Sequence, residues 1–223
     1  MDPLSITAAT LAIIQASSST YKTIQHVKGL PKAFEEVGQN LNLVEVTLDL
    51  VQKRLETGTD AEADSEAIKG VLIACQEKAE SLNTIFQKIN EKKVMENHAK
   101  EWSAIASFYR TMVLRLGKAH RVETLMQDIL NGLKGLTMNQ VFRSASQTQI
   151  ERLEDAIKKL SEVEPSIKES DFEHGRANLT MHIASGGKGN QFHSEGKSSQ
   201  TNNLGPQYTL SHGNMNFGTP TAE

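Results

Sequence analysis

The sequence has few of the residues that mark disulfide-rich, membrane-spanning or nucleic-acid-binding proteins. It contains one cysteine, Cys75, in 223 residues, which excludes an internal disulfide framework and is typical of a reducing compartment. No run of about 18 purely apolar residues occurs, so no constitutive membrane span is expected. The net charge of −3 gives no reason to expect nucleic-acid binding. Asp2 stands where a secretory signal would be basic, so we expect a cytoplasmic protein at rest.

Motifs of catalysis and of metal binding are also missing. The segment Gly186–Gly189 has neither the spacing nor the hydroxyl residue of a phosphate-binding loop. No His-Glu-x-x-His, nucleophile elbow or paired-cysteine motif is present. The histidines near the C-terminus are irregularly spaced, unlike metal ligands. We therefore expect no enzyme activity, no cofactor and no metal site.

The residues that are present begin with an uncharged segment from Pro3 to Tyr21, for which Ser5 is the expected helix N-cap. Small residues recur every four positions in this segment, a spacing that lets helices approach closely. One interpretation is a core helix of a soluble bundle, and the other is a helix that enters a bilayer once released. The candidate membrane-helix residues are Ile6, Ala8, Leu11, Ala12, Ile13, Ile14 and Ala16.

The strongest periodic signal lies in the next segment, where apolar residues alternate at spacings of three and four from Phe34 to Leu55. This spacing predicts a long helix with one apolar face. Similar patterns predict a third helix to about Lys93 with Cys75 in its apolar stripe, and a fourth over about residues 99–133. After a break at 132–137, a fifth helix ends near Pro165. The fold class is therefore an all-α bundle of about five helices.

The expected fourth helix carries only positive charges between Trp102 and Val122. At about 100° per residue these side chains fall opposite the apolar face. They form either a solvated face or a contact for anionic lipid head groups. The residues are Arg110, Arg115, Lys118 and Arg121.

The composition changes around Asp171, which divides the chain into a helical domain, 1–170, and a tail, 171–223, rich in Gly, Asn and Gln. A Gly-x-Gln-aromatic unit occurs at Gly189–Phe192 and again at Gly205–Tyr208. Alone, such a segment does not bury enough apolar surface to fold, but stacked copies form Asn/Gln ladders in cross-β fibres. The candidate amyloid residues are Gly189, Asn190, Gln191, Phe192, Gln200, Thr201, Asn202, Asn203, Gly205, Gln207, Tyr208, Asn214, Asn216 and Phe217.

Parts of the sequence resemble a known fungal signalling system. The opening residues 1–6, the segment 29–37 (Gly-Leu-Pro-Lys-Ala-Phe-Glu-Glu-Val) and the segment 40–44 resemble the SesA-type domain, which precedes NACHT and other STAND receptors and also occurs in small effectors. The tail is similar to the pseudo-palindromic, RHIM-like amyloid signalling motifs of the same pathways. Glu195, Lys197 and Pro206 depart from that pattern, and Pro206 has to lie at a turn or bulge.

The resemblance implies a non-enzymatic effector or adaptor of regulated cell death in heterokaryon incompatibility or fungal innate immunity. A NACHT or other NLR-type receptor with a matching motif would template the tail. The bundle would then act at the plasma membrane, as proposed for the related HeLo and HELL domains, or recruit another partner. The expected partners are the chain itself, such a receptor and anionic membrane, but no nucleic acid. The alternative is a constitutive helical interaction module with a passive disordered tail.

Overall fold

The computed structural model describes residues 2–57, 65–96, 99–138, 147–173, 208–211 and 214–217. The chain divides into two compact units, Met1–Arg176 and Ala177–Glu223. Composition alone placed a boundary near Asp171, but the last helix of the first unit extends past that residue. Polar and apolar residues alternate over residues 178–183, a pattern that predicts a short strand, but this segment lies outside the described residues.

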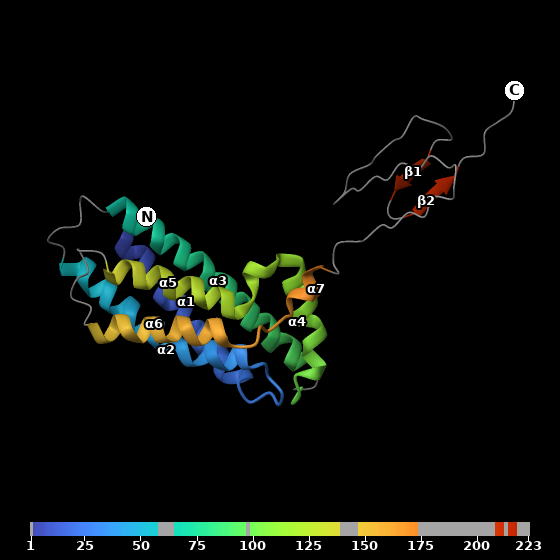
Figure 1. The fold of residues 1–223 in the computed structure, drawn as a ribbon, viewed down its shortest axis with the longest axis horizontal. Helices are drawn as coiled ribbons and strands as arrows, with labels where there is room; N and C mark the ends of the chain where they lie inside the picture. Colours follow the sequence, from blue (N-terminus) through green and yellow to red (C-terminus); the bar gives the residue numbers. More distant parts are fainter. Residues whose placement is uncertain are drawn as a thin grey trace, which may run out of the picture. The chain divides into compact units, whose positions relative to one another are not determined.

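The first unit is an all-α bundle, which confirms the predicted fold class (Figure 1). Most of its helices run along its length, while α4 (Ser103–Leu116) and α7 (Glu169–Glu173) lie at one end. Its described residues form seven α-helices and one short 3-10 helix rather than about five helices. They are α1 (Pro3–Ile24), α2 (Lys32–Thr57), α3 (Ser65–Met95), α4 (Ser103–Leu116), η1 (Lys118–His120), α5 (Val122–Met138), α6 (Gln147–Glu162) and α7 (Glu169–Glu173).

Helix α1 begins at Pro3 because Asp2, not Ser5, is its N-cap. One Asp2 carboxylate oxygen accepts a hydrogen bond from the Ser5 backbone N–H at 3.0 Å, and the other accepts from the Ser5 hydroxyl at 2.7 Å. The Ser5 hydroxyl and backbone N–H together lower the pKa of Asp2. The prediction of Ser5 as the cap was wrong, because Pro3 is favoured in the first turn and shifts the start of the helix towards Asp2.

The predicted apolar face of α2 forms the centre of the bundle. Six of its seven residues are buried, and Leu55 is half-buried against the same core. Helix α3 likewise turns its predicted face inward, with only Val71 half-buried. Fully burying such a side chain stabilises the fold by about 1.5–3 kcal/mol relative to leaving it exposed. Periodicity therefore located the core of these two helices correctly.

The single helix expected over residues 99–133 is two helices. Helix α4 ends at Leu116, and Gly117 adopts a φ of 93°, a conformation that favours glycine. The 3-10 turn of η1 then leads into α5. The prediction was wrong because a glycine cap ends the helical hydrogen-bond ladder without disturbing the apolar spacing on either side.

The break expected at residues 132–137 is also wrong, since α5 continues to Met138. Gly132 lies where α5 meets α3, and a Cβ atom built there would lie 2.6 Å from the Cys75 sulfur. Gly132 therefore allows α5 to approach α3 closely, and it does not mark a turn. Helix α6 follows, and Gln149 on it donates a 2.7 Å hydrogen bond to the Thr47 hydroxyl of α2. Val141 and Phe142, expected in the fifth helix, lie outside the described residues.

The described part of the second unit is one antiparallel pair of strands, β1 (Tyr208–Ser211) and β2 (Asn214–Phe217). Tyr208 is the register partner of Phe217, and Ser211 is that of Asn214. An isolated two-stranded hairpin is marginally stable in water. The pairing of β1 with β2 is therefore expected to contribute little stability by itself.

Candidate functional site

The candidate membrane-helix residues are distributed around α1. Ile6 and Ile14 are buried in the core, and Leu11 and Ile13 are half-buried against it. Ala8, Ala12 and Ala16 are exposed, so the small-residue stripe is not buried against another helix of the bundle. The described helices include none that is both long and apolar enough to cross a bilayer.

The inward face of α1 carries hydroxyl groups as well as isoleucines. Thr7, Thr10 and Ser17 are buried, and each donates a 2.8 Å hydrogen bond to the backbone carbonyl four residues earlier. Buried hydroxyls of this kind are satisfied within their own helix. Helix α1 can therefore bury or expose this face without leaving these hydroxyls unpaired.

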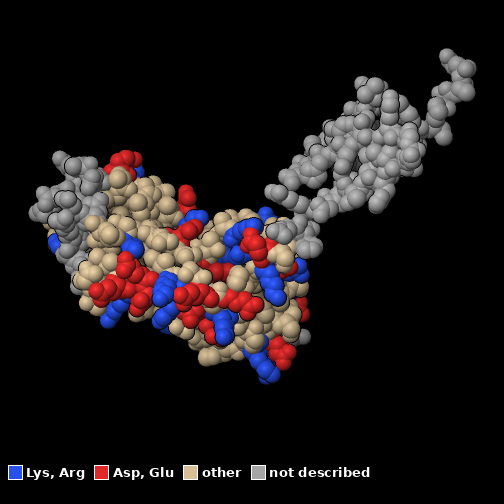
Figure 2. Space-filling view, in the orientation of Figure 1, with Lys and Arg blue, Asp and Glu red and all other residues tan. Residues whose placement is uncertain are grey.

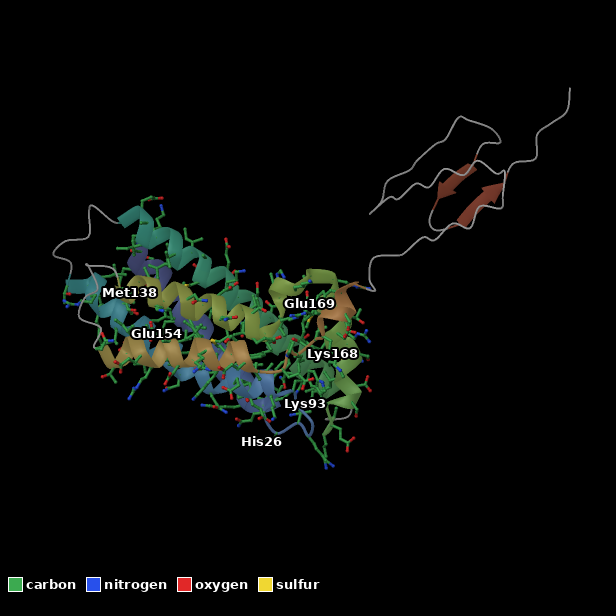
Figure 3. All side chains as sticks on the ribbon, in the orientation of Figure 1. His26, Lys93, Met138, Glu154, Lys168 and Glu169 are labelled. Carbon is green, nitrogen blue, oxygen red and sulfur yellow. The ribbon has the colours of Figure 1, made fainter. Side chains whose placement is uncertain are left out.

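Three of the four candidate lipid-contact cations are paired with acids of α7. The Arg110 guanidinium donates to Asp171 at 2.9 Å, and that of Arg121 donates to Glu169 at 2.7 Å. Lys118 forms an ion pair with the same Glu169 carboxylate. Figure 3 labels Glu169 and Lys168 beside the α4–α5 end of the bundle. The four cations are called the basic surface below.

Residues 164–173, called the cover segment below, are held on the bundle by further contacts. Ile167 is buried, and the Phe172 ring lies 4.8 Å from the Arg121 guanidinium carbon, a cation–π contact. The Tyr109 and Ser166 hydroxyls share a 2.7 Å hydrogen bond. Burial raises the pKa of Tyr109 above its ordinary value, so this phenol stays protonated at neutral pH.

A buried carboxylate lies beneath the cover segment. Glu123 on α5 is only 7% exposed, and its Oε1 accepts a 3.0 Å hydrogen bond from the Ser166 backbone N–H. Its Oε2 makes no hydrogen bond to any of the described residues. Burying a carboxylate that lacks hydrogen bonds is costly. The hydrogen bond from Ser166 therefore helps to hold the cover segment on the bundle.

A pocket of about 330 Å³ opens between α4, the start of α2 and the cover segment. The Trp102 and Tyr109 rings, with centroids 5.6 Å apart, line it together with the Lys32, Arg110 and Lys168 side chains. The Phe34 ring packs against both aromatic rings. The pocket belongs to the contact between the cover segment and the bundle, because residues of both line it.

Cys75 lies in the core, as predicted. Its side chain is 2% exposed, and its thiol donates a weak 3.8 Å hydrogen bond to the Ile129 carbonyl. Burial, with a smaller contribution from Asp128, raises the thiol pKa to about 12. A protonated, buried thiol is a poor nucleophile. Within the part of the chain that the structure describes, no three His, Cys, Asp or Glu side chains are grouped to hold a metal ion.

Most of the candidate amyloid residues lie outside the described residues. Those from Gly189 to Gln207 belong to this group. Tyr208 lies in β1, and Asn214, Asn216 and Phe217 lie in β2. Asn216 is the register partner of Thr209. The placement of these four is compatible with a hairpin-forming segment, and assembly into fibres stays a prediction.

Sequence reasoning found the cations but missed the acids that pair with them. Glu169 and Asp171 lie 48 to 61 positions along the chain from their basic partners. Their only signal in the sequence is an acidic run beside the expected domain boundary.

Comparison with known families identifies the helical unit. A family described as "SesA: N-terminal domain on NACHT_NTPase and P-loop NTPases" matches residues 7–136, which is more than half of the chain. The match covers most of α1 and α5 and all that lies between them, and therefore the basic surface and most of the core. No curated protein and no solved structure matches the chain.

Proposed function

The chain belongs to the SesA family of N-terminal domains on NACHT and P-loop NTPases, and on that premise we propose that it is a non-enzymatic effector or adaptor of regulated cell death in fungal incompatibility or innate immunity. The observation that carries the proposal is the family match over α1 to α5. SesA domains are associated with NACHT NTPases, so a STAND receptor is the partner that this membership favours.

We propose that the tail receives the signal by amyloid templating. A receptor that carries a matching motif would seed cross-β stacking of the Gly/Asn/Gln-rich repeats. The helical units would be gathered at high local concentration along the fibre. The competing function is a constitutive interaction module whose tail plays no part in signalling.

The proposal can be tested by seeding cells that express the full chain. Preformed fibres of a peptide covering residues 174–223 should trigger death with the parent protein. They should not do so when Gln191, Gln200 and Gln207 are all replaced by proline, because proline removes ladder donors and fixes φ. Equal death with the parent and the triple variant would refute templating and favour the constitutive module.

The output of the helical unit is proposed to be membrane disruption. Released α1 helices would pack through Ala8, Ala12 and Ala16 and hide their hydroxyls from lipid. The basic surface would hold the bundle against anionic head groups, with each cation worth about 1 kcal/mol near the surface. Cytoplasmic protein would thereby move to the plasma membrane on activation.

The exposure of Ala12 gives a clean test of insertion. Ala12→Glu changes an exposed position, so the bundle should stay folded, whereas Ile13 is half-buried and its replacement would also disturb packing. A charge at the bilayer centre disfavours insertion by about 2.5–3.5 kcal/mol. We expect Ala12→Glu to abolish seeded vesicle leakage, while Ala67→Glu at an exposed position of α3 leaves it intact. Undiminished leakage by the Ala12 variant would make the chain an adaptor that recruits another partner.

A further inference from the structure

The structure shows acids of one segment lying on the cations proposed to meet the membrane. We propose that the cover segment, residues 164–173, occupies in the free chain a surface for anionic lipid head groups, and that membrane binding requires its displacement. This inference rests on the proposed membrane function and concerns how that surface is controlled.

The cover segment is negatively charged, as an anionic lipid head group is. It contains four acidic residues and one lysine, and two of its carboxylates bind three cations of the basic surface. Lysine and arginine bind carboxylates and phosphates with the same donors. Glu169 and Asp171 therefore fill positions that head-group phosphate or carboxylate groups would otherwise occupy. Figure 2 shows acidic and basic side chains next to one another over this end of the bundle.

The basic surface also carries an exposed apolar residue, which favours a membrane over an acidic protein segment. Leu116 is 48% exposed and lies between Arg115 and Lys118 at the turn that Gly117 makes. Cations that flank an exposed leucine suit the boundary between head groups and acyl chains. Arg115 is exposed as well, and it adds a fourth positive charge to this contact.

The contacts of the cover segment are suited to exchange. The Lys118–Glu169 pair is more than half exposed on both side chains, and the Arg110–Asp171 pair is 54% and 27% exposed. Exposed ion pairs contribute little to stability and weaken with salt. Helix α7 has only five residues, and Ile167 is the buried apolar residue of the segment. A surface rich in anionic lipid can therefore compete for Arg110 and Lys118, whereas the Arg121 side chain is only 12% exposed.

The cover segment lies next to the tail that is proposed to receive the amyloid signal. It lies between α6 and the Gly/Asn/Gln-rich tail in the sequence. A single bundle competes with its own tethered acids, which have a high effective concentration. A fibre presents many bundles to one membrane at once, and that multivalency shifts the competition towards lipid. Membrane contact would in this way depend on assembly.

The test neutralises the acids in the full-length protein. Glu169→Gln with Asp171→Asn releases the three cations, and its control is Glu77→Gln with Glu91→Gln on exposed positions of α3. The control changes net charge by the same amount and leaves the cover segment paired. Binding is measured by co-sedimentation with phosphatidylcholine vesicles, with and without phosphatidylserine. We expect the cover variant to bind phosphatidylserine vesicles about tenfold more tightly than the control, and neutral vesicles no better.

Adding Arg110→Gln and Lys118→Gln to the cover variant should return binding to the control level. Equal binding by the cover variant and its control would overturn the inference, and so would binding that survives loss of these cations. A second measurement needs no variant: after seeding, amide exchange of residues 166–173 in parent protein bound to phosphatidylserine vesicles should be faster than in the free protein. Unchanged exchange in vesicle-bound parent protein would also overturn the inference. If exchange is unchanged but seeded parent protein still kills cells, the proposed function stands and only the inference about the cover segment fails.

Discussion

Replacing Gly132 with alanine tests the close contact between α3 and α5. The new Cβ atom would lie 2.6 Å from the Cys75 sulfur and 3.4 Å from a Val71 methyl carbon. Carbon atoms in good van der Waals contact lie about 3.5–4.0 Å apart, so the sulfur has to move. Cys75 is 2% exposed and has little free space into which to move.

The magnitude follows from two opposing effects. Overpacking of a well-packed core costs about 1–3 kcal/mol, whereas Gly to Ala inside a helix gains about 1 kcal/mol. We expect Gly132→Ala to lower the free energy of unfolding by about 0–2 kcal/mol. In the double variant with Cys75→Ala, the new methyl group takes the volume of the lost sulfur. We expect that protein to lie within about 1 kcal/mol of the parent.

Urea unfolding followed by circular dichroism measures all four members of this cycle. The matched control is Gly135→Ala in the same helix, where a built Cβ atom meets nothing within 4 Å. That substitution should stabilise the protein by about 1 kcal/mol. The coupling between Gly132→Ala and Cys75→Ala should be about 1–3 kcal/mol in favour of the double variant. A coupling near zero, or equal stabilisation at both glycines, would refute the close contact.

Three further predictions concern two buried residues, Tyr109 and Cys75. Tyr109→Phe removes the hydroxyl that shares a hydrogen bond with Ser166, so amide exchange in residues 166–173 should become about two- to tenfold faster, while exchange in α2 stays unchanged and serves as the internal reference. Cys75 should resist thiol reagents at neutral pH until the protein unfolds, and rapid labelling of the native protein would contradict its burial. Because folding raises the pKa of this thiol from 9.0 to about 12, the native state binds its proton more tightly than the unfolded state. The stabilisation is therefore present below pH 9 and is lost as pH rises from 9.0 to about 12. Cys75→Ala should weaken this alkaline loss of stability in pH-dependent unfolding.

The sequence by itself determined the fold class and much of the core. The spacing from Phe34 to Leu55 identified the buried face of α2, and the stripe around Cys75 identified that of α3. Each result depended on a local property, since the side chains that face one way along a helix recur every three or four residues. The cations of the basic surface were equally visible, because they form an uninterrupted run of one sign.

Tertiary structure decided which neighbour each face meets. Helix α1 carries no charge from Pro3 to Tyr21, so its sequence did not reveal that Ala8, Ala12 and Ala16 would be exposed while Thr10 and Ser17 would be buried. Gly132 resembled a helix break because glycine permits both a turn and a close approach, and only the position of Cys75 distinguished the two. The pairing of Arg110 with Asp171 joins residues 61 positions apart. Such a contact depends on how the chain returns to α4 after α6, and no local pattern carries that information.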